Sequence, residues 1–392
     1  MHGLRLPERA DAAIVGAGIT GTSLAHHLSR RGLRVVVLDR DRVAAGPTGR
    51  STAIVRAHYS QPLLVRMAAR GLDVYRTFER ETGATAGFTH TGVLWLVGEA
   101  DRAALEANVA LGRAAGADLE LVEPDALHSI EPRLSSDGIA AACWEPEAGH
   151  CDPYLAAAGY MGSAEAAGAV LAEGATVTAV EPGRVHVGER AIAVDHVVIA
   201  AGVWSAPLLA PLGFDLPVVA ARAQIGRFRA PAGFGPMPPA IADLGPLQFY
   251  ARASEGDYLE VGTLDPAHGE DPIDPDACPE GAETTTLAAF RRSLVARLPG
   301  LAGGHWRGAW SSVYDVTPDW QPAIGPVPGV AGVYLAAGFS GHGFKLAPAV
   351  GLALAGLIAD GAWDTFDLDL LDPQRFARRE LIESRYGYSV VG

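Results

Sequence analysis

A glycine-rich segment near the N-terminus has the residue types and spacing of a phosphate-binding loop. Gly16, Gly18 and Gly21 fit the pattern G-x-G-x-x-G. A short apolar run, Ala12–Val15, precedes them, and a helical pattern over Thr20–Arg31 follows. In such a loop the first glycine permits a tight turn, the second lets the backbone approach a pyrophosphate, and the third packs the helix against the strand. The N–H groups at the start of the helix favour phosphate, so the segment predicts dinucleotide binding.

An acidic residue follows at the distance expected for ribose recognition. Asp39 comes directly after the β-branched run Arg34–Leu38, 39 − 16 = 23 residues after Gly16. Its carboxylate can accept a hydrogen bond from a ribose 2′-hydroxyl and would repel a 2′-phosphate, so NADP is disfavoured. The loop by itself does not separate NAD from FAD.

The rest of the chain predicts the elements that must position this loop. The strand His196–Ala201 ends at Gly202 and leads into a helix over Trp204–Leu212, which is typical of a parallel sheet with ligands near its carboxyl end. We expect a second, more antiparallel sheet and several helices from the remaining patterns. The strands expected in this second sheet are Gln224–Phe228, Gln248–Arg252, Tyr258–Leu264 and Trp306–Tyr314. Further strands are expected at Val93–Val97, Val177–Val180, Val185–Val187 and Gly332–Ala337. One helix is expected to begin near Pro62, and others to cover Asp101–Ala115, Asp152–Gly168, Thr285–Leu298 and about Leu346–Ala359.

These patterns predict an α/β fold with two domains. The first is a discontinuous, Rossmann-type FAD-binding domain at residues 1–85, 150–215 and 322–392. The second is a substrate-binding domain at 86–149 and 216–321, built on a large mixed or antiparallel β-sheet with helices.

Composition limits the partners. The chain has 392 residues, 49% of them hydrophobic, a formal net charge of −14 and three cysteines. The charge argues against nucleic acid or an anionic membrane as a partner, although ordinary solubility also explains it. The N-terminus has no signal-peptide pattern, no long uncharged apolar run is present, and the cysteines lack metal-ligand spacing. We therefore expect a cytoplasmic protein with reduced thiols, no metal site and a small-molecule substrate.

Four separated segments resemble the D-amino-acid oxidase superfamily, specifically its sarcosine oxidase and glycine oxidase branch. They run in the expected order from about residue 11 to residue 356: AIVGAGITGTSLAHHLSRRGLRVVVLDR, GRSTAIVRAHY, VVIAAGVWSAPLLAPLGFDLPV, and SSVYDVTPDWQPAIGP with GFSGHGFKLAPAVG. The resemblance implies FAD lying extended in the first domain, with its flavin facing a substrate cavity roofed by the second domain's sheet. It implies hydride transfer to FAD from the C–N unit of an amine or amino acid, secondary or N-substituted and bearing a carboxylate, which gives an imine, with oxygen as acceptor.

The segment GFSGHGFK suits the flavin end of such a site. Its glycines let the backbone approach a flat ring, and the helix after Lys345 directs its positive end toward the edge where reduced flavin is anionic. A turn that serves packing alone is the other reading. The complete set of expected FAD-binding residues is Gly16, Gly18, Ile19, Thr20, Gly21, Asp39, Arg40, Thr48, Arg50, Ser51, Thr52, Val177, Ala201, Gly202, Trp204, Gly338, Ser340, Gly341, His342, Gly343, Phe344 and Lys345.

The resemblance also implies the residues that contact substrate. Arg56 and Lys345 stand at motif positions whose basic residues hold the substrate carboxylate, and an Arg fork suits a carboxylate. A pyrophosphate contact or a surface ion pair is the alternative for Arg56. Tyr314 matches a tyrosine of the family's site, and Tyr250 lies in a strand that faces the flavin; either can also be an ordinary buried tyrosine.

Three positions depart from the branch. Ser312 replaces the cysteine that carries covalent flavin, and none of the three cysteines is near, so we predict non-covalent FAD. In an ungapped match Glu260 replaces a lysine implied to activate oxygen, and an anion there disfavours superoxide. Either another acceptor takes the electrons or the match is displaced by one residue. Binding of a substrate amine and exposure to solvent are the other roles open to Glu260. Ala53 replaces an arginine, which indicates a substrate other than sarcosine.

Two alternatives to an oxidase stay open. Glu260 favours a dehydrogenase or biosynthetic tailoring enzyme with another electron acceptor. A flavin-carrying subunit of a larger complex is disfavoured, because Arg56, Tyr314 and Lys345 are all retained. The oligomeric state, the stereochemistry of the substrate and the role of the acidic loop at 265–283 are open at this stage.

Overall fold

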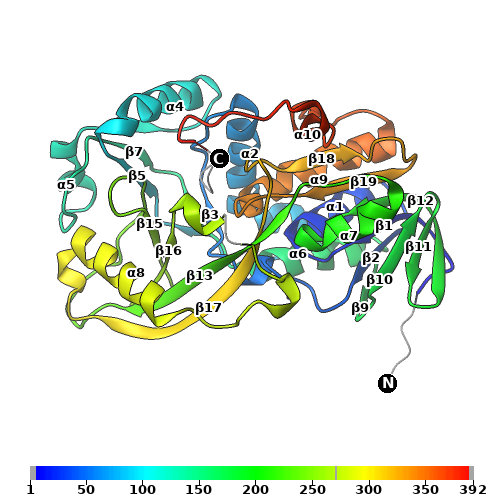
Figure 1. Ribbon diagram of the computed structural model, residues 1–392, viewed down its shortest axis with the longest axis horizontal. Coiled ribbons are helices and arrows are strands. Elements are labelled where there is room, and N and C mark those ends of the chain that lie inside the picture. Colours follow the sequence, from blue (N-terminus) through cyan, green and yellow to red (C-terminus); the bar gives the residue numbers. More distant parts are fainter. Residues whose placement is uncertain (1–5, 270–271, 388–392) are drawn as a thin grey trace.

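In the part of the chain that the structure describes, two eight-stranded β-sheets, a small three-stranded sheet and the helices packed on them form the fold (Figure 1). The computed structural model describes residues 6–269 and 272–387. The first sheet has the order β10-β11-β12-β1-β2-β9, and β19 extends it beside β12 with β18 at its outer side. Its strands are β1 (Arg9–Val15), β2 (Val35–Asp39), β9 (Val170–Glu173), β10 (Val177–Glu181), β11 (Arg184–Val187), β12 (Arg190–Ile199), β18 (Ala323–Pro326) and β19 (Val333–Ala337).

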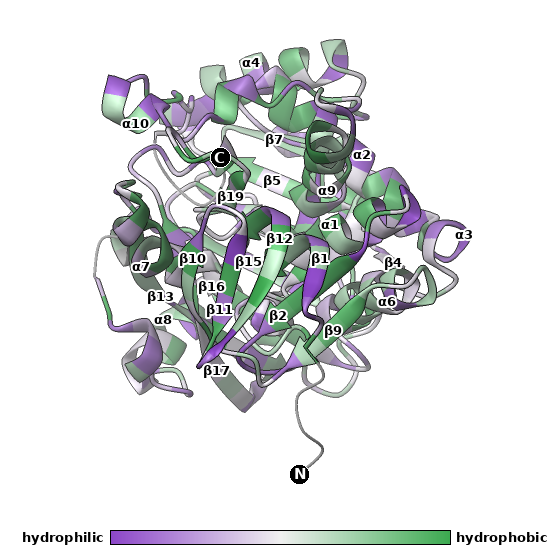
Figure 2. Cartoon of the chain, turned by 90° about the vertical axis from the view of Figure 1, so that its right-hand side faces the viewer, coloured by the Kyte–Doolittle hydropathy of each residue, from purple (hydrophilic) through white to green (hydrophobic). Residues whose placement is uncertain are grey.

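The centre of this sheet is parallel. β1 pairs in parallel with β2 and with β12, and β12 pairs in parallel with β19. Val35–Leu38 of β2 is buried on both faces, as expected for a parallel strand covered by helices, and β2 is largely hydrophobic in Figure 2. The carboxyl ends of β1, β2 and β12 therefore meet at one edge, where the glycine loop and Asp39 lie.

Helix α1 (Ile19–Arg30) follows the glycine loop and packs closely on α9 (Gly343–Asp360). A β-carbon at Gly351 would lie 2.3 Å from Ser23 Oγ, so only glycine permits this crossing. Among the described residues, α9 alone is long and apolar enough to cross a membrane, but 72% of it is buried, and it packs on both α1 and α2 (Pro62–Arg76). This packing places the start of α9 beside the glycine loop.

The second sheet has the order β17-β13-β16-β15-β14-β5-β7-β6. Its neighbouring strands are antiparallel except for the parallel pair of β14 and β5. The strands are β5 (Val93–Val97), β6 (Glu120–Val122), β7 (Ala141–Glu145), β13 (Val219–Arg229), β14 (Ala240–Asp243), β15 (Phe249–Ala253), β16 (Tyr258–Thr263) and β17 (His305–Val316).

Alternation along these strands decides what faces the first domain. Phe249 and Ala251 of β15 belong to the apolar cluster that packs under helix α8 (Thr284–Arg297). Tyr250 and Arg252, one residue out of step, point to the opposite face, because side chains alternate along a strand. Tyr250, on that opposite face, lines the same cavity as the glycine loop and the start of α9.

The remaining elements connect these layers. A small sheet of β3 (Ile54–Val55), β8 (Gly149–His150) and β4 (Thr89–His90) holds the segment around Arg56. The other helices are α3 (Phe78–Thr82), α4 (Arg102–Ala114), α5 (Leu127–Ile130), α6 (Pro153–Ala166), α7 (Ser205–Leu209) and α10 (Arg375–Arg378).

The predicted α/β class with two large sheets is confirmed. The single helix expected over Trp204–Leu212 is instead α7 between two 3-10 turns, at Gly202–Trp204 and Ala210–Leu212. Pro211 lacks the N–H that a continuing helix requires, which accounts for its early end. The strands β7, β9 and β14 lie where no strand was expected.

Candidate active site

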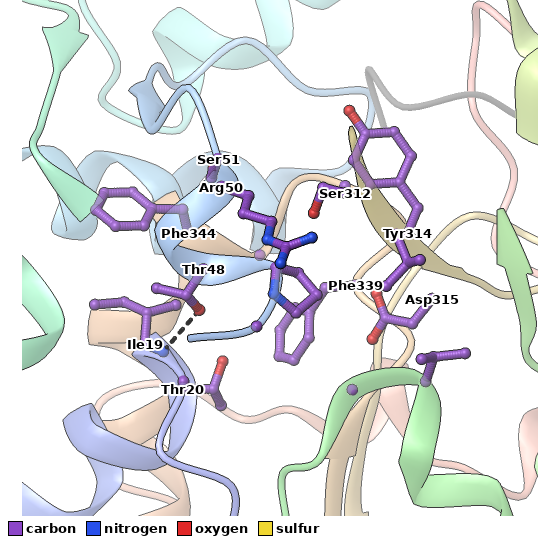
Figure 3. Close-up of a pocket in the computed structure, with 18 of the residues that line it drawn as sticks. Ile19, Thr20, Thr48, Arg50, Ser51, Ser312, Tyr314, Asp315, Phe339 and Phe344 are labelled. Carbon is purple, nitrogen blue, oxygen red and sulfur yellow. Dashed lines mark hydrogen bonds between the residues drawn. The ribbon is translucent and has the colours of Figure 1, made fainter. Parts of the chain in front are cut away.

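A cavity of about 540 Å³ lies between the two sheets and receives side chains from both. Figure 3 shows Ile19, Thr20 and Thr48 on one side of it, and Tyr314, Asp315 and Phe339 on the other. Of the residues expected at the FAD site or the substrate site, the cavity is lined by Gly16, Gly18, Ile19, Thr20, Asp39, Arg40, Thr48, Arg50, Ser51, Thr52, Arg56, Val177, Ala201, Gly202, Trp204, Tyr250, Tyr314, Gly341, Gly343, Phe344 and Lys345.

The glycine loop has the backbone shape that a pyrophosphate needs. Gly16 has φ +111°, and a β-carbon there would lie 2.4 Å from the carbonyl oxygen of Ala200. A β-carbon at Gly21 would lie 2.0 Å from the carbonyl oxygen of Gly16, so Gly21 lets α1 pack on the turn and does not itself line the cavity. The lining face of the loop therefore has no side chain at Gly16 or Gly18, which leaves room for a phosphate group.

Two side chains fix the loop from either side. Asp39 Oδ2 accepts the backbone N–H of Ala17 at 2.7 Å, and its Oδ1 accepts that of Asp41 at 2.8 Å. Thr48 Oγ1 accepts the backbone N–H of Ile19 at 3.1 Å (Figure 3). A carboxylate has about four acceptor positions, so Asp39 can hold the loop and also bind a ribose hydroxyl in the cavity.

The acidic loop after β16 closes the Asp39 end of the cavity. Asp276 of this loop lines the cavity and pairs with Arg40 at 2.8 Å. It also accepts the indole N–H of Trp204 at 3.0 Å, and the Arg40 guanidinium lies 4.3 Å from the Trp204 ring centre. The described part of the loop thus covers the dinucleotide end of the cavity.

The opposite end holds two buried cations. Arg56 is 4% exposed and Lys345 is 6% exposed, and both line the cavity. The Arg56 guanidinium lies 4.1 Å from the ring centre of Tyr59 and 4.8 Å from that of Trp95, and its Nη1 donates to the carbonyl oxygen of His58. Burial and the charge of Arg56 both lower the pKa of Lys345 well below its usual value. An anionic group in the cavity would offset this repulsion.

His342 supports this end from behind and does not line the cavity. Its Nε2 lies 2.7 Å from the carbonyl oxygen of Trp320, so Nε2 carries the proton and donates. Its Nδ1 then accepts from the Tyr59 hydroxyl at 3.2 Å. Burial lowers the pKa of His342 to about 3, so the ring is neutral near pH 7 and fixes Tyr59 beside Arg56.

Gly338 and Ser340, two more expected FAD-binding residues, also lie outside the lining. The Gly338 N–H donates to Asp315 Oδ2 at 2.7 Å, and Ser340 Oγ accepts the backbone N–H of Thr317 at 3.2 Å. These contacts join the turn after β19 to the end of β17. The two residues thus shape the flavin end without facing it.

Tyr250 and Tyr314 line the cavity from β15 and β17. A β-carbon at Gly262, opposite Tyr250 on β16, would lie 2.4 Å from the Tyr250 ring, so glycine makes room for that ring. Burial raises the pKa of both tyrosines, and they remain neutral hydrogen-bonding groups.

Glu260 is not brought to the cavity. It pairs with Arg252 at 2.7 Å on the neighbouring strand and accepts a hydrogen bond from Ser254 Oγ at 3.1 Å. Its charge is therefore opposed by a buried guanidinium. Ala53 does not line the cavity either.

One expectation about the cysteines needs correction. Ser312 lines the cavity, and Cys278, far away in sequence, has its sulfur 3.7 Å from the Ser312 carbonyl oxygen. The acidic loop brings Cys278 to β17, which sequence distance did not indicate. Cys278 is nevertheless outside the cavity lining.

Several lining residues were not predicted. The substrate end has an apolar wall on β5, on β14 and just after β16. β17 also contributes an acid to the lining, Asp315, whose pKa burial raises. The continuous apolar run of β5 gave no sign of which of its side chains would face the cavity, and Asp276 carries no local signal. The lining residues that were not predicted include Val93, Trp95, Ala240, Ala242, Leu264, Asp315 and Phe339.

Comparisons with known proteins agree with this geometry. The chain is 29% identical to the bovine FAD-dependent oxidoreductase domain-containing protein 1, over 92% of this chain and 84% of that protein. It is 28% identical to monomeric sarcosine oxidase of Streptomyces avermitilis, over 94% of this chain and 98% of that protein. The crystal structure of L-proline dehydrogenase from P. horikoshii superimposes with a TM-score of 0.88 at 27% identity, covering 96% of this chain and all (100%) of that one.

The sequence model of the DAO family, which is described as FAD dependent oxidoreductase, matches residues 11–357 of this chain. That span contains the glycine loop, both buried cations and the start of α9. The protein therefore belongs to the DAO family of FAD-dependent oxidoreductases, with FAD as its cofactor.

Proposed function

We propose that this protein oxidises the C–N unit of an amine or amino acid that carries a carboxylate, with an imine as product. One observation carries the proposal: the cavity that begins at the dinucleotide loop ends at Arg56 and Lys345. Two buried cations at the far end of an FAD site form a place for a substrate anion.

The cavity wall around these cations contacts the part of the substrate that does not carry the carboxylate. Val93, Trp95, Ala242 and Leu264 line this end, so the group attached to the amine meets apolar side chains. Arg56 can hold a carboxylate through two parallel N–H bonds, while Lys345 adds a compact charge. Together they fix one end of the substrate and leave its α-carbon oriented toward the flavin.

The chain's residues also favour the neutral form of the amine. Positive charges nearby disfavour a further positive charge, so Arg56 and Lys345 lower the pKa of a bound ammonium group. FAD, when bound, supplies the acceptor for a hydride from the carbon next to nitrogen. Gly341, Gly343 and the start of α9 line the cavity there, and the helix N-terminus favours negative charge. No strong protein base is then required.

We propose oxygen as the electron acceptor. The anion of Glu260, which argued against this from the sequence, is paired with Arg252 and lies outside the cavity lining. The similarity to the structure of an L-proline dehydrogenase favours a second candidate, the same half-reaction with another acceptor.

Anaerobic mixing of the FAD-loaded protein with N-methyl and cyclic amino acids tests the proposal. Loss of the oxidised flavin absorbance with at least one of them is the expected result. Admission of air then separates the two candidates, because rapid re-oxidation supports an oxidase and slow re-oxidation supports a dehydrogenase. A flavin that no amine in the panel reduces would contradict both.

A further inference from the structure

A buried carboxylate that the reaction outlined above does not use lies behind the substrate end of the cavity. Glu145 is 2% exposed and ends β7, opposite Val93 on β5. Its Oε2 accepts the backbone N–H of Ala57 at 2.6 Å, and its Oε1 accepts the indole N–H of Trp95 at 2.6 Å and the backbone N–H of His58 at 3.3 Å. All three of these partners are donors, which favours the ionised carboxylate. Burial raises the pKa of Glu145, whereas these hydrogen bonds and the charge of Arg56 lower it.

These three bonds act on the surroundings of Arg56. Ala57 and His58 are the next two residues of the chain, and the His58 carbonyl oxygen accepts from the Arg56 guanidinium. Trp95 is one of the two rings against which that guanidinium lies, at 4.8 Å. Glu145 therefore fixes both the backbone that carries Arg56 and the indole that supports its fork.

Glu145 also opposes the repulsion between the two cations. Burial and Arg56 lower the pKa of Lys345, whereas the charge of Glu145 raises it. The other titratable groups around Lys345 are Tyr75 on α2, which donates to the Phe344 carbonyl oxygen, and Tyr59 and His342 in the adjoining loops. Burial raises the pKa of both tyrosines and lowers that of His342 to about 3, so these three groups are uncharged near pH 7.

We propose that Glu145 is the positioning residue of the carboxylate-binding pair: through the Ala57 and His58 amides and the Trp95 indole it holds the Arg56 fork in place, with a carboxylate behind the two basic side chains. The inference rests on the proposed function, because it assigns Arg56 and Lys345 to a substrate carboxylate. Glu145 itself touches neither substrate nor flavin, since it lies outside the cavity lining.

The test is the binding of benzoate, a simple carboxylate, to the oxidised holoenzyme, followed as a change in flavin absorbance across pH. Wild type should bind with an affinity that falls as pH rises through the pKa of Lys345. We call this fall in affinity with pH the pH limb. Lys345→Met should remove the limb, which would assign it to the titration of Lys345. In Glu145→Gln the limb should move to lower pH by roughly one unit, and affinity at neutral pH should fall about tenfold, because an anion near the lysine is gone and one donor faces an amide NH₂.

Two variants separate charge from geometry. Glu145→Asp keeps the charge, so its limb should stay at the wild-type pH even if affinity falls. Trp95→Phe removes one donor to the carboxylate and also changes a ring that lines the cavity, so its readout is the pH limb, which should stay at the wild-type pH, and not its affinity. These two variants also test the inference if Glu145→Gln fails to fold. The matched control is Glu147→Gln, two residues further on, which removes an exposed carboxylate paired with Arg76 and should behave as wild type.

The outcomes distinguish this inference from the function on which it rests. If wild type binds benzoate but Glu145→Gln keeps the wild-type affinity and limb, Glu145 is not a positioning residue and the proposed function stands. A limb that moves equally in Glu145→Asp and Glu145→Gln contradicts the charge argument. Failure of wild type to bind benzoate or any amino acid of the panel overturns the carboxylate site and the inference with it.

Discussion

The carboxylate of Asp39 accepts the backbone N–H of Ala17 at 2.7 Å. This bond joins the end of β2 to the middle of the glycine loop. The residue expected to bind the ribose is therefore also the residue that shapes the phosphate-binding turn.

We predict that Asp39→Asn weakens FAD binding by roughly tenfold to a hundredfold. A charge-assisted hydrogen bond contributes about 1.5–3 kcal/mol, and the variant loses the charge toward the Ala17 and Asp41 amides as well as toward a ribose. Equilibrium titration of apoprotein with FAD, read by flavin fluorescence, measures this. Asp195→Asn, which removes an exposed carboxylate paired with Arg9 on the same sheet, is the control. Equal FAD affinity in both variants would remove Asp39 from the site.

Removal of either buried cation should affect the substrate and spare the cofactor. Arg56→Met and Lys345→Met should each raise KM for a carboxylate-bearing substrate about tenfold to a hundredfold, since each loses a charge-assisted bond. Arg56→Lys should restore only part of the affinity, because it keeps the charge and lacks the planar fork. Steady-state kinetics at matched FAD content measure this. A fall in kcat with unchanged KM in Arg56→Met would contradict the assignment.

FAD should be released by acid. Ser312 occupies the lining position at which the resemblance implies a flavin-bearing cysteine, and Cys278 lies behind the Ser312 carbonyl oxygen, outside the cavity lining. After precipitation with trichloroacetic acid, the yellow colour should stay in the supernatant for wild type and for Cys278→Ser alike. A yellow pellet that turns white in Cys278→Ser would show a covalent bond to that sulfur.

The contacts of Asp276 should slow the loss of FAD by a small factor. Asp276 joins Arg40 and Trp204 over the Asp39 end of the cavity, but the Asp276 side chain is 58% exposed. Exposed pairs contribute little, so Asp276→Asn should speed FAD release at most about fivefold, and less at high salt. Stopped-flow dilution into an apoflavoprotein trap measures the rate. Asp257→Asn, which removes the exposed pair with Arg229, should leave the rate of FAD release unchanged. If Asp257→Asn speeds release as much as Asp276→Asn does, the acidic loop does not retain FAD.

Stability should fall on acidification below about pH 6.5. Burial lowers the pKa of His26 and His150 to about 4, and that of His27, His58 and His342 to about 3. Between these values and 6.5 the unfolded chain binds more protons than the folded one, so the free energy of unfolding rises with pH there and levels off above 6.5. Each such histidine contributes a slope of up to about 1.4 kcal/mol per pH unit.

Urea unfolding between pH 4 and 8 measures this slope. His26→Gln, which can keep the hydrogen bond to Ser163, should flatten it, whereas His128→Gln, at an exposed position, should not. A slope that His26→Gln leaves unchanged would assign the acid lability to other groups.

Most residues predicted for the dinucleotide half of the site line the cavity, because the signals that predicted them are local. The G-x-G-x-x-G loop, the buried run of β2 and Asp39 lie within 24 residues (39 − 16 + 1 = 24), and chain geometry alone brings them to one edge of the sheet. The fold class followed for the same reason, from strand and helix patterns that each extend over a few residues.

The substrate half depends on contacts between distant segments. Glu145 stands in the polar run Glu145-Pro146-Glu147, which is typical of an exposed turn, yet β7 buries it against Trp95 and the segment after Arg56. Asp276 reaches the cavity, and Cys278 the back of Ser312, only because the acidic loop folds back over this end. Glu260 was expected at the flavin by motif position, and its pairing with Arg252 on β15 depends on a strand register that the sequence did not specify.

The most direct test of the proposed function is rapid anaerobic mixing of the holoenzyme with matched pairs of amines that differ only in the carboxylate. Proline with pyrrolidine, and N-methylglycine with dimethylamine, are two such pairs. The carboxylate-bearing member of the best pair should reduce the flavin at concentrations at least tenfold lower, and Arg56→Met should abolish that preference. Equal reduction by both members of every pair, or reduction only by the amines without a carboxylate, would contradict the account.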